Sequence, residues 1–210
     1  HDPFLMKSMQ EAVIRVEIAI KKDQKILVYG DYDVDGTTSV AMMYLFLKKH
    51  NENVEYYIPS REDEGYGISL KGIDYASKNN FSLIIALDCG IRAVEQINYA
   101  NKKGVDFIIC DHHNPSDKIP NAVAVLNPKQ FRCNYPYKDL SGCGVGFKLI
   151  QAYSLNNNIP FDEIIEYLDL VSVSIGADIV PMTGENRVLA FYGLKKIENE
   201  PSNNINIYIR

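Results

Sequence analysis

The sequence predicts an α/β fold, in which a doubly wound, mainly parallel five-stranded sheet is flanked by helices and followed by a helical C-terminal part. Two observations predict it. Up to about residue 140, short apolar runs alternate with helical segments of roughly 10 to 15 residues, which is typical of buried parallel strands joined by crossover helices. Beyond that point, helical segments follow one another without intervening strands. The hydrophobic content of 46% is ordinary for a protein with a substantial core.

Each strand is predicted from an apolar run that ends at glycine, proline or a polar cluster. The first run, KILVYGD, ends beside Gly30, and the second is closed by Pro59. The expected strands are residues 25–31, 53–60, 81–90, 105–113 and 122–128.

The helices are predicted from apolar side chains at helical spacing and from their end signals. The segment that follows the first strand is expected to become helical at Thr37 or Thr38. The expected helices are residues 4–22, 37–50, 70–80, 91–104, 142–157, 161–175 and 185–197.

Four parts of the chain are expected from these elements. An N-terminal helix (1–24) leads into an α/β catalytic core (25–140). A helical part of the same domain (141–197) follows, and residues 198–210 are expected to form a linker toward a second domain. The chain opens on His-Asp-Pro rather than on an initiator methionine, so we expect it to be cut from a longer protein.

Composition excludes several classes. No apolar run approaches the roughly 18 residues that span a bilayer, and no signal peptide is recognisable, so a cytoplasmic protein without a membrane partner is expected. The four cysteines lack CxxC spacing, which favours free thiols over a disulfide or zinc site. The net charge of −5 gives no general nucleic-acid footprint. A polyanionic substrate would therefore need metal ions or a partner domain.

Acidic and histidine residues stand where three of the expected strands end. Because ligands bind at the carboxyl ends of parallel strands, these side chains should converge on one edge of the sheet. The residues are Asp31, Asp33 and Asp35 after the first strand, Asp88 after the third, and Asp111, His112 and His113 after the fourth.

A calcium loop is the first alternative, because DYDVDG (31–36) matches the opening of an EF-hand loop. The twelfth position, however, is Met42 where a bidentate glutamate is required, and a strand rather than a helix precedes the loop. A solvated acidic turn is the second alternative. It leaves the residues at the ends of the other two strands unexplained.

A pair of divalent ions explains them better. Carboxylates together with imidazoles suit Mn²⁺ or Mg²⁺ rather than a thiolate zinc site. Two ions about 3.5–4 Å apart need a bridging carboxylate, and Asp88, alone on its strand, is the natural bridge. Asp33 and Asp35 could each face a different ion. Of the two adjacent histidines, one could bind an ion while the other meets the substrate.

Several motifs in order carry a resemblance to a known family. GDYDVDGTTS, DCG, DHH and SGCGVGFKL resemble the DHH phosphoesterase superfamily. REDEGYGIS and GADIVPMTGENRVLAFYGL resemble, within that superfamily, the RecJ group of single-strand-specific 5′→3′ exodeoxyribonucleases. The resemblance extends from about residue 2 to residue 197.

The resemblance implies a role for each matching residue. Two Mn²⁺ or Mg²⁺ ions would be held by Asp33, Asp35, Asp88 (bridging), His112 and Asp178. His113 would contact the scissile phosphate, and Asp31 matches the motif either as a direct ligand or as a residue behind the ligands. The implied chemistry is metal-assisted hydrolysis of single-stranded DNA in repair and recombination. The catalytic residues would be His113, Asp88 and His112.

Substrate contacts are expected from four further residues, each with a structural alternative. Arg61 and Tyr66 lie in a loop at the end of a strand. The alternative is that this loop is simply solvated and contacts no substrate. Gly144 lies in a glycine-rich turn that opens a helix, where backbone N–H groups could hold a phosphate or simply pack against the sheet. Arg187 resembles a residue near the family's site, or pairs within the last helix.

The resemblance also implies what lies outside this sequence. RecJ-type enzymes continue into a second, DHH-associated domain and an OB-type domain, so we expect these 210 residues to bind ions and to cleave DNA slowly by themselves. Single-strand-binding protein or a helicase would be candidate partners of the whole protein.

Two other functions are weighed against this one. Small-substrate relatives act on short oligonucleotides or cyclic dinucleotides and usually carry a histidine four residues before the first Asp of the DxD pair, where this chain has Tyr29. A non-catalytic binding module would have lost acidic ligands, and this chain keeps them.

Overall fold

Five parallel strands form one sheet in the computed structural model of the chain, which describes residues 1–199. The order across the sheet is β2-β1-β3-β4-β5, and each neighbouring pair runs parallel. The predicted five-stranded parallel sheet is therefore confirmed. The order reverses between β1 and β3, and such a switch point leaves a crevice at the carboxyl ends of the strands. The strands are β1 (Lys25–Gly30), β2 (Val54–Tyr57), β3 (Phe81–Leu87), β4 (Asp106–Cys110) and β5 (Ala124–Leu126).

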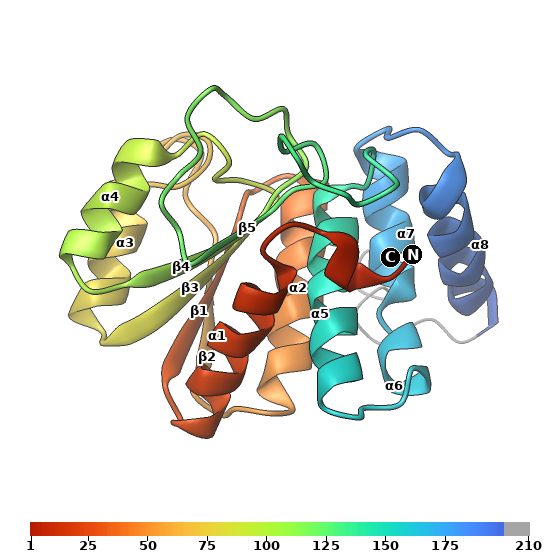
Figure 1. Cartoon of the computed structure of the whole chain (residues 1–210), viewed down its shortest axis with the longest axis horizontal. Coiled ribbons are helices and arrows are strands. Elements are labelled where there is room, and N and C mark those ends of the chain that lie inside the picture. Colours follow the sequence, from red (N-terminus) through yellow and green to blue (C-terminus); the bar gives the residue numbers. More distant parts are fainter. Residues whose placement is uncertain (200–210) are drawn as a thin grey trace.

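Helices cover both faces of the sheet (Figure 1). One face is covered by α3 and α4, and the other by α1, α2 and α5, with α7 and α8 in a further layer beyond α5. The helices are η1 (Pro3–Leu5), α1 (Met9–Lys21), α2 (Val34–Lys48), α3 (Leu70–Lys78), α4 (Val94–Lys102), α5 (Gly142–Asn156), α6 (Asp162–Ile165), α7 (Leu168–Ala177) and α8 (Gly184–Asn199).

The strands are buried on both faces because their side chains alternate between two apolar clusters. Ile26 and Val28 of β1 pack into the cluster under α1, α2 and α5, whereas Leu27 and Tyr29 pack into the one under α3 and α4. The first cluster runs on from the sheet into α5, α7 and α8. The helical segment after residue 140 is thus packed against the core by a continuous apolar interior.

Several predicted helix boundaries are wrong, and three of them have a clear structural reason or change the elements themselves. The helix after β1 begins at Val34 rather than at Thr37 or Thr38, because the Asp33 carboxylate accepts a hydrogen bond from Gly36 N at 2.8 Å and caps it. The N-terminal helix begins at Met9, after a separate 3₁₀ turn and Ser8, whose φ of 65° lies in the left-handed region. The helix expected over 161–175 is two helices, α6 and α7.

The predicted linker begins inside α8, which continues to Asn199. The remainder of that predicted linker, residues 200–210, lies outside the described residues. Among residues 1–199, no helix is both long and apolar enough to cross a bilayer.

Candidate metal centre

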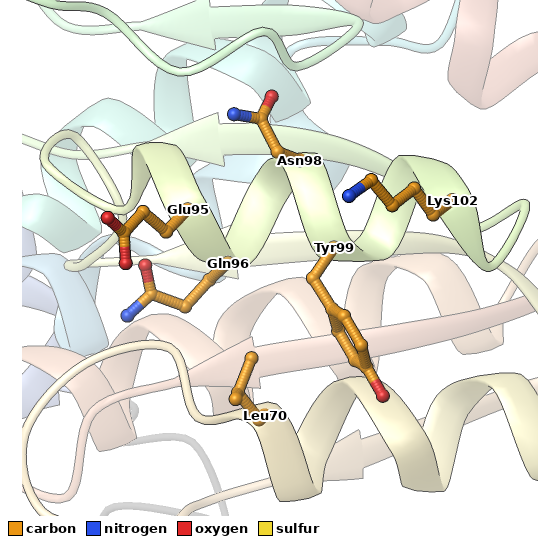
Figure 2. A pocket seen from close by; sticks show the side chains of 6 residues that line it. All are labelled: Leu70, Glu95, Gln96, Asn98, Tyr99 and Lys102. Carbon is orange, nitrogen blue, oxygen red and sulfur yellow. The ribbon is translucent and has the colours of Figure 1, made fainter.

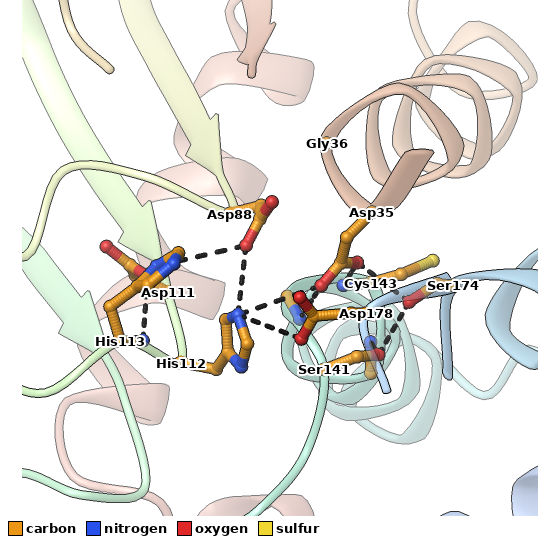
Figure 3. Close-up of polar contacts among 12 residues, drawn as sticks. Asp35, Gly36, Asp88, Asp111, His112, His113, Ser141, Cys143, Ser174 and Asp178 are labelled. Atoms are coloured by element: carbon orange, nitrogen blue, oxygen red, sulfur yellow. Dashed lines mark hydrogen bonds and ion pairs between the residues drawn. The ribbon is translucent and has the colours of Figure 1, made fainter. Parts of the chain in front are cut away.

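The carboxyl ends of β1, β3 and β4 bring the predicted acidic and histidine residues to one edge of the sheet (Figure 3). Asp31, Asp88 and Asp111 each follow directly on the last residue of their strands. In the sheet register Gly30 pairs with Leu87, and Leu87 pairs with Cys110. The three carboxylates therefore start from adjacent points of the ladder, at and beside the switch point.

The three aspartates after β1 have different surroundings. Asp31 is fully buried; its Oδ1 accepts from Tyr32 N at 2.7 Å, and its Oδ2 has no hydrogen-bond partner. Burial raises the pKa of Asp31 above its usual value. Asp33 is exposed and caps α2, whereas Asp35 lies in the first turn of α2 and is 2% exposed.

Asp35 is held by the start of helix α5. Its two carboxylate oxygens accept hydrogen bonds from Gly142 N at 2.7 Å and Cys143 N at 2.8 Å. Ser174 of α7 donates its hydroxyl to Asp35 Oδ1 at 2.7 Å and lies 2.6 Å from Ser141 Oγ. A helix N-terminus favours negative charge, so this cradle suits a carboxylate at the base of the site.

Asp88 is the most perturbed acid of the site. It is 1% exposed, its φ of 58° is left-handed, and its Oδ1 accepts no hydrogen bond. Burial, with the nearby Asp35 and Asp33 carboxylates, raises the pKa of Asp88 to about 10. A Cβ at Gly142 would lie 2.6 Å from Asp88 Oδ1, so only glycine lets α5 approach this carboxylate.

His112 lies between the carboxylates of the sheet and those of the helices. Its Nε2 is 3.2 Å from Asp88 Oδ1, 3.5 Å from Asp178 Oδ2 and 3.8 Å from Asp35 Oδ2. The ring is 7% exposed, and neither of its nitrogens has a hydrogen-bond partner. Asp178 comes at the end of α7, and its side chain is 29% exposed.

His113 is oriented by Asp111. Its Nδ1 lies 2.8 Å from Asp111 Oδ1, whose other oxygen accepts from Ile91 N at 2.8 Å. The hydrogen bond that Asp111 accepts from His113 raises the pKa of His113. Burial raises the pKa of Asp111, but the bonds from His113 outweigh burial and hold it below its usual value. The far nitrogen, His113 Nε2, lies 3.3 Å from the hydroxyl of Tyr66.

These residues fit a pair of divalent ions. Two sets of ligand atoms converge within 4.8 Å, Asp88 with His112 and His113, and Asp35 with His112 and Asp178. Buried polar groups without partners are costly, and here Asp88 Oδ1, Asp31 Oδ2 and both nitrogens of His112 are of that kind. Cations would satisfy the two carboxylate oxygens and one nitrogen of His112, whose other nitrogen would carry a proton. The carboxylate and imidazole donors are those that Mn²⁺ and Mg²⁺ accept.

The four expected substrate contacts are placed differently from one another. Tyr66 is 58% exposed beside His113, and the exposed Arg61 stacks over the ring of Tyr32 at 5.5 Å. Gly144 is buried, and its N–H donates to Ser141 Oγ at 3.1 Å, so this helix terminus serves Asp35 and its own cap. Arg187 is exposed on α8, with no contact to the site among the described residues.

Sequence reasoning missed the residues that support Asp35. Ser174 lies in an apolar helix and carries no motif, and Gly142 and Cys143 act through backbone N–H groups. The glycine-rich SGCG turn was the available signal, but its N–H groups receive a protein carboxylate rather than a free phosphate. The orienting role of Asp111 was also missed, although the DHH motif includes it.

A small cavity opens on the site. It measures about 160 Å³ and is lined by Asp33, Val34, Asp35, Ala177 and Asp178. A larger hollow of about 400 Å³ lies between α3 and α4 (Figure 2). None of the predicted site residues lines it, and Glu95 and Lys102 are its charged groups, so it offers no comparable chemistry. Its lining residues are Leu70, Glu95, Gln96, Asn98, Tyr99 and Lys102.

Fold and site together define an α/β protein with carboxylate and histidine groups that could hold divalent ions at the switch point of a parallel sheet. The chain belongs to the DHH family, whose N-terminal-domain model matches residues 25–175. Two curated relatives are similar over most of the chain, and both are named single-stranded-DNA-specific exonuclease RecJ. The Bacillus subtilis protein is 44% identical over 94% of this chain and 24% of its own length. The Escherichia coli protein is 34% identical over 91% of this chain and 35% of its own length.

Solved structures agree with this assignment. A crystal structure of exonuclease RecJ bound to manganese superposes with a TM-score of 0.84 at 32% identity, covering 91% of this chain and 48% of the other. The manganese complex of RecJ from Thermus thermophilus gives 0.79 at 30% identity, over 91% of this chain and 27% of the other. The chain spans between about a quarter and a third of the length of the curated relatives described above.

Proposed function

We propose that this chain is the catalytic part of a metal-dependent exonuclease that hydrolyses single-stranded DNA from the 5′ end, in DNA repair and recombination. One observation carries the proposal. The unpartnered Nε2 of His112 faces three carboxylates, from Asp88, Asp35 and Asp178, at the carboxyl edge of the sheet. The names of the relatives support the substrate, and the manganese complexes support the ions.

The ions would be Mn²⁺ or Mg²⁺, both of which occur in titles of similar RecJ structures. Bound there, two ions would supply an activated water and offset charge on the phosphoryl oxygens. Asp88 would bridge the two ions and His112 would bind one of them, and Asp31, which has one oxygen without a hydrogen-bond partner, would be either a direct ligand or a residue behind the ligands. The ligands would be Asp33, Asp35, Asp88, His112 and Asp178.

The remaining work falls to residues outside that ligand set. Asp111 fixes the ring of His113 through Nδ1, so that Nε2 can present a proton to a phosphate oxygen. Without a substrate, the Tyr66 hydroxyl pairs with His113 Nε2, and a phosphate oxygen would replace it. Arg61, 5.5 Å above the ring of Tyr32, offers a cation close to this loop. Arg187 and the turn at Gly144 remain proposed substrate contacts.

An acidic chain with a net charge of −5 needs help to hold DNA. We infer that the ions supply part of it and that further domains of the whole protein, one DHH-associated and one of OB type, supply most of the rest. Single-strand-binding protein or a helicase would be its partners, and a DNA substrate implies a cytoplasmic location. By themselves, the 210 residues should bind the ions and cleave slowly.

A DHH phosphodiesterase for short oligonucleotides or cyclic dinucleotides is the second candidate. One observation counts against it. Tyr29, where small-substrate relatives usually have a histidine, is fully buried and packs into the apolar cluster under α3 and α4. Its hydroxyl donates to Gly67 O at 2.8 Å and accepts from Ser69 N at 3.1 Å, so it anchors the loop that carries Tyr66.

A digestion assay tests the proposal. The full-length protein with Mn²⁺ is given single-stranded DNA labelled at either end, with RNA and a cyclic dinucleotide as competitors, and Asp88→Ala is assayed beside it. We expect release from the 5′ end first and no release by the variant. Release from the 3′ end, preference for the cyclic dinucleotide, or an active Asp88→Ala enzyme would overturn the proposal.

A further inference from the structure

The loop that follows Asp178, a proposed metal ligand, is fixed by hydrogen bonds several residues away from that carboxylate. Asp178 ends α7, and the next residue, Ile179, has a left-handed φ of 54° and a side chain that is 87% exposed. Packing of that side chain therefore cannot fix the loop. The last turn of α7 holds the Asp178 backbone through its N–H bond to Ser174 O at 2.9 Å, and contacts between residues 180 and 186 hold the loop that follows.

Asn186 makes the central contact. Its side chain is completely buried in the first turns of α8, and its amide nitrogen donates to two main-chain carbonyls, Pro181 O at 3.1 Å and Asp139 O at 2.6 Å. Both protons of the amide are used. The first bond fixes the loop after Asp178, and the second joins it to the segment that leads into α5.

Tyr137 also binds this loop, and we call the contacts of Asn186 and Tyr137 with it the clamp. Its hydroxyl donates to Pro181 O at 3.0 Å and lies 3.3 Å from Thr183 Oγ1. Gly184 allows this approach, because a Cβ there would stand 2.6 Å from the Tyr137 ring, and its φ of 48° is left-handed. The loop is thus held against residues 137–139 by side chains from two directions.

That second segment matters because it continues directly into the cradle of Asp35. Two residues after Asp139 comes Ser141, which caps α5 and touches Ser174, and then Gly142, whose N–H binds Asp35. Asn186 therefore links the two pieces of backbone that position Asp35 and Asp178, the carboxylates that converge with His112 on one of the two ion positions.

We propose that Asn186 is a positioning residue, which sets the affinity of the ion position that Asp35 and Asp178 help to form and leaves the other ion position largely unaffected. The inference rests on the proposed function, since it takes Asp35 and Asp178 as ligands. Only a carboxamide meets the requirement. Aspartate would set an anion against two carbonyl oxygens, and alanine would leave both carbonyls without this donor.

The test is a titration of the full-length, metal-free protein with Mn²⁺, followed by the electron paramagnetic resonance signal of the free ion. In Asn186→Ala, one of the two ions should bind about 10- to 100-fold more weakly, as is typical when support behind a ligand is lost, while the other keeps its affinity. Asn186→Asp should lose at least as much. Asn199→Ala, the matched control on the same helix, loses a bond to Lys195 O and should bind both ions as the parent does.

A double-mutant cycle separates positioning from general destabilisation. In an Asp178→Asn background the ligand is already compromised, so adding Asn186→Ala should cost little further affinity. Equal weakening of both ions, full additivity in the cycle, or unchanged binding in Asn186→Ala would overturn the inference. If Asp178→Asn itself leaves both affinities intact, the assigned ligand set fails, and the inference fails with it. If Asp178→Asn weakens one ion and Asn186→Ala does not, only the inference fails.

Discussion

The site has two halves that hold their acidic groups by different means. In the sheet half, Asp31, Asp88 and Asp111 each follow a strand directly. The backbone hydrogen bonds between the strands therefore fix their positions. In the helical half, Asp35 begins a helix and Asp178 ends one. Side-chain and backbone donors between residues 141 and 186 fix these two carboxylates or their loops.

The two halves also differ in how well their charges are compensated. Asp35 receives two N–H groups and a hydroxyl, whereas Asp88 accepts no hydrogen bond at Oδ1 and has a pKa raised to about 10 by burial and its acidic neighbours. Asp35 therefore lies in a preformed set of donors, whereas Asp88 would need cations to complete its surroundings. Substitutions in the sheet half should act on binding and chemistry, and those in the helical half on position and stability.

The largest effect is expected in the sheet half. Asp88→Asn keeps the size of the side chain and removes the charge that would face both ions. Because bound ions supply several kcal/mol of transition-state stabilisation, hydrolysis by the full-length protein should fall roughly 10³-fold. The thermal stability of the metal-free protein should not fall, since a costly buried acid is removed. A variant that keeps within about tenfold of the parental rate, in single-turnover assays, would contradict this.

The next effect concerns stability in the helical half. Glu185 of α8 accepts from the buried Lys148 at 3.0 Å and from Tyr135 at 2.6 Å. Glu185→Gln would leave Lys148 uncompensated and should lower the unfolding free energy by about 3 kcal/mol at neutral pH. Denaturant unfolding measures it, with the exposed Glu198→Gln as the control on the same helix.

The same pair predicts a pH dependence. Burial raises the pKa of Glu185, but Lys148 and Tyr135 outweigh burial and hold it below its ordinary value of 4.5. The carboxylate therefore contributes its full stabilisation above that value and loses it as the pH falls through the folded pKa. The difference in stability between the parent and Glu185→Gln should shrink as the pH falls below 4.5. A gap that stays constant into acid would show that the charge of Glu185 is not its source.

A smaller effect is expected from the hydroxyl behind Asp35. Ser174→Ala removes the bond to Asp35 Oδ1 and should weaken binding of one Mn²⁺ about tenfold, with little change in the unfolding free energy. Calorimetric titration of the metal-free protein measures this. Ser172→Ala is the matched control, because its hydroxyl donates to Asp169 O within the same helix. Equal losses in the two variants would remove the distinction between a supporting and a structural serine.

The smallest effect is expected at Tyr66. Tyr66→Phe removes the hydroxyl 3.3 Å from His113 Nε2 and keeps the ring. One hydrogen bond to a histidine that Asp111 already orients should be worth a rate change of about threefold to tenfold. The Mn²⁺ affinity should stay as it is. A loss of ion binding in this variant would show that Tyr66 supports the ligands themselves, and the separation between substrate and ion contacts would then fail.

The sequence predicts the sheet half of the site better than the helical half. Asp88 and the Asp111-His112-His113 run are predictable because parallel strands end at one edge of a sheet, and a run of apolar residues shows where each strand ends. The start of α2 was less predictable. Three nearby aspartates suggest a turn, whereas in the structure Asp33 accepts a hydrogen bond from Gly36 N and caps a helix that has already begun. Asp178 follows no strand, and only its likeness to a family motif marked it.

The sequence by itself determined the alternation of strands and helices, the acidic edge of the sheet and the chemistry of its ligands, because these depend on local pattern and on one rule of sheet geometry. Only the tertiary structure decided what surrounds them. Three donors to Asp35, from Gly142, Cys143 and Ser174, lie 107 to 139 residues away along the chain, and the bond from Asn186 to Asp139 joins residues 47 apart. Such contacts arise from the packing of α5, α7 and α8 on α2, and no periodicity in a single segment encodes which residues that packing brings together.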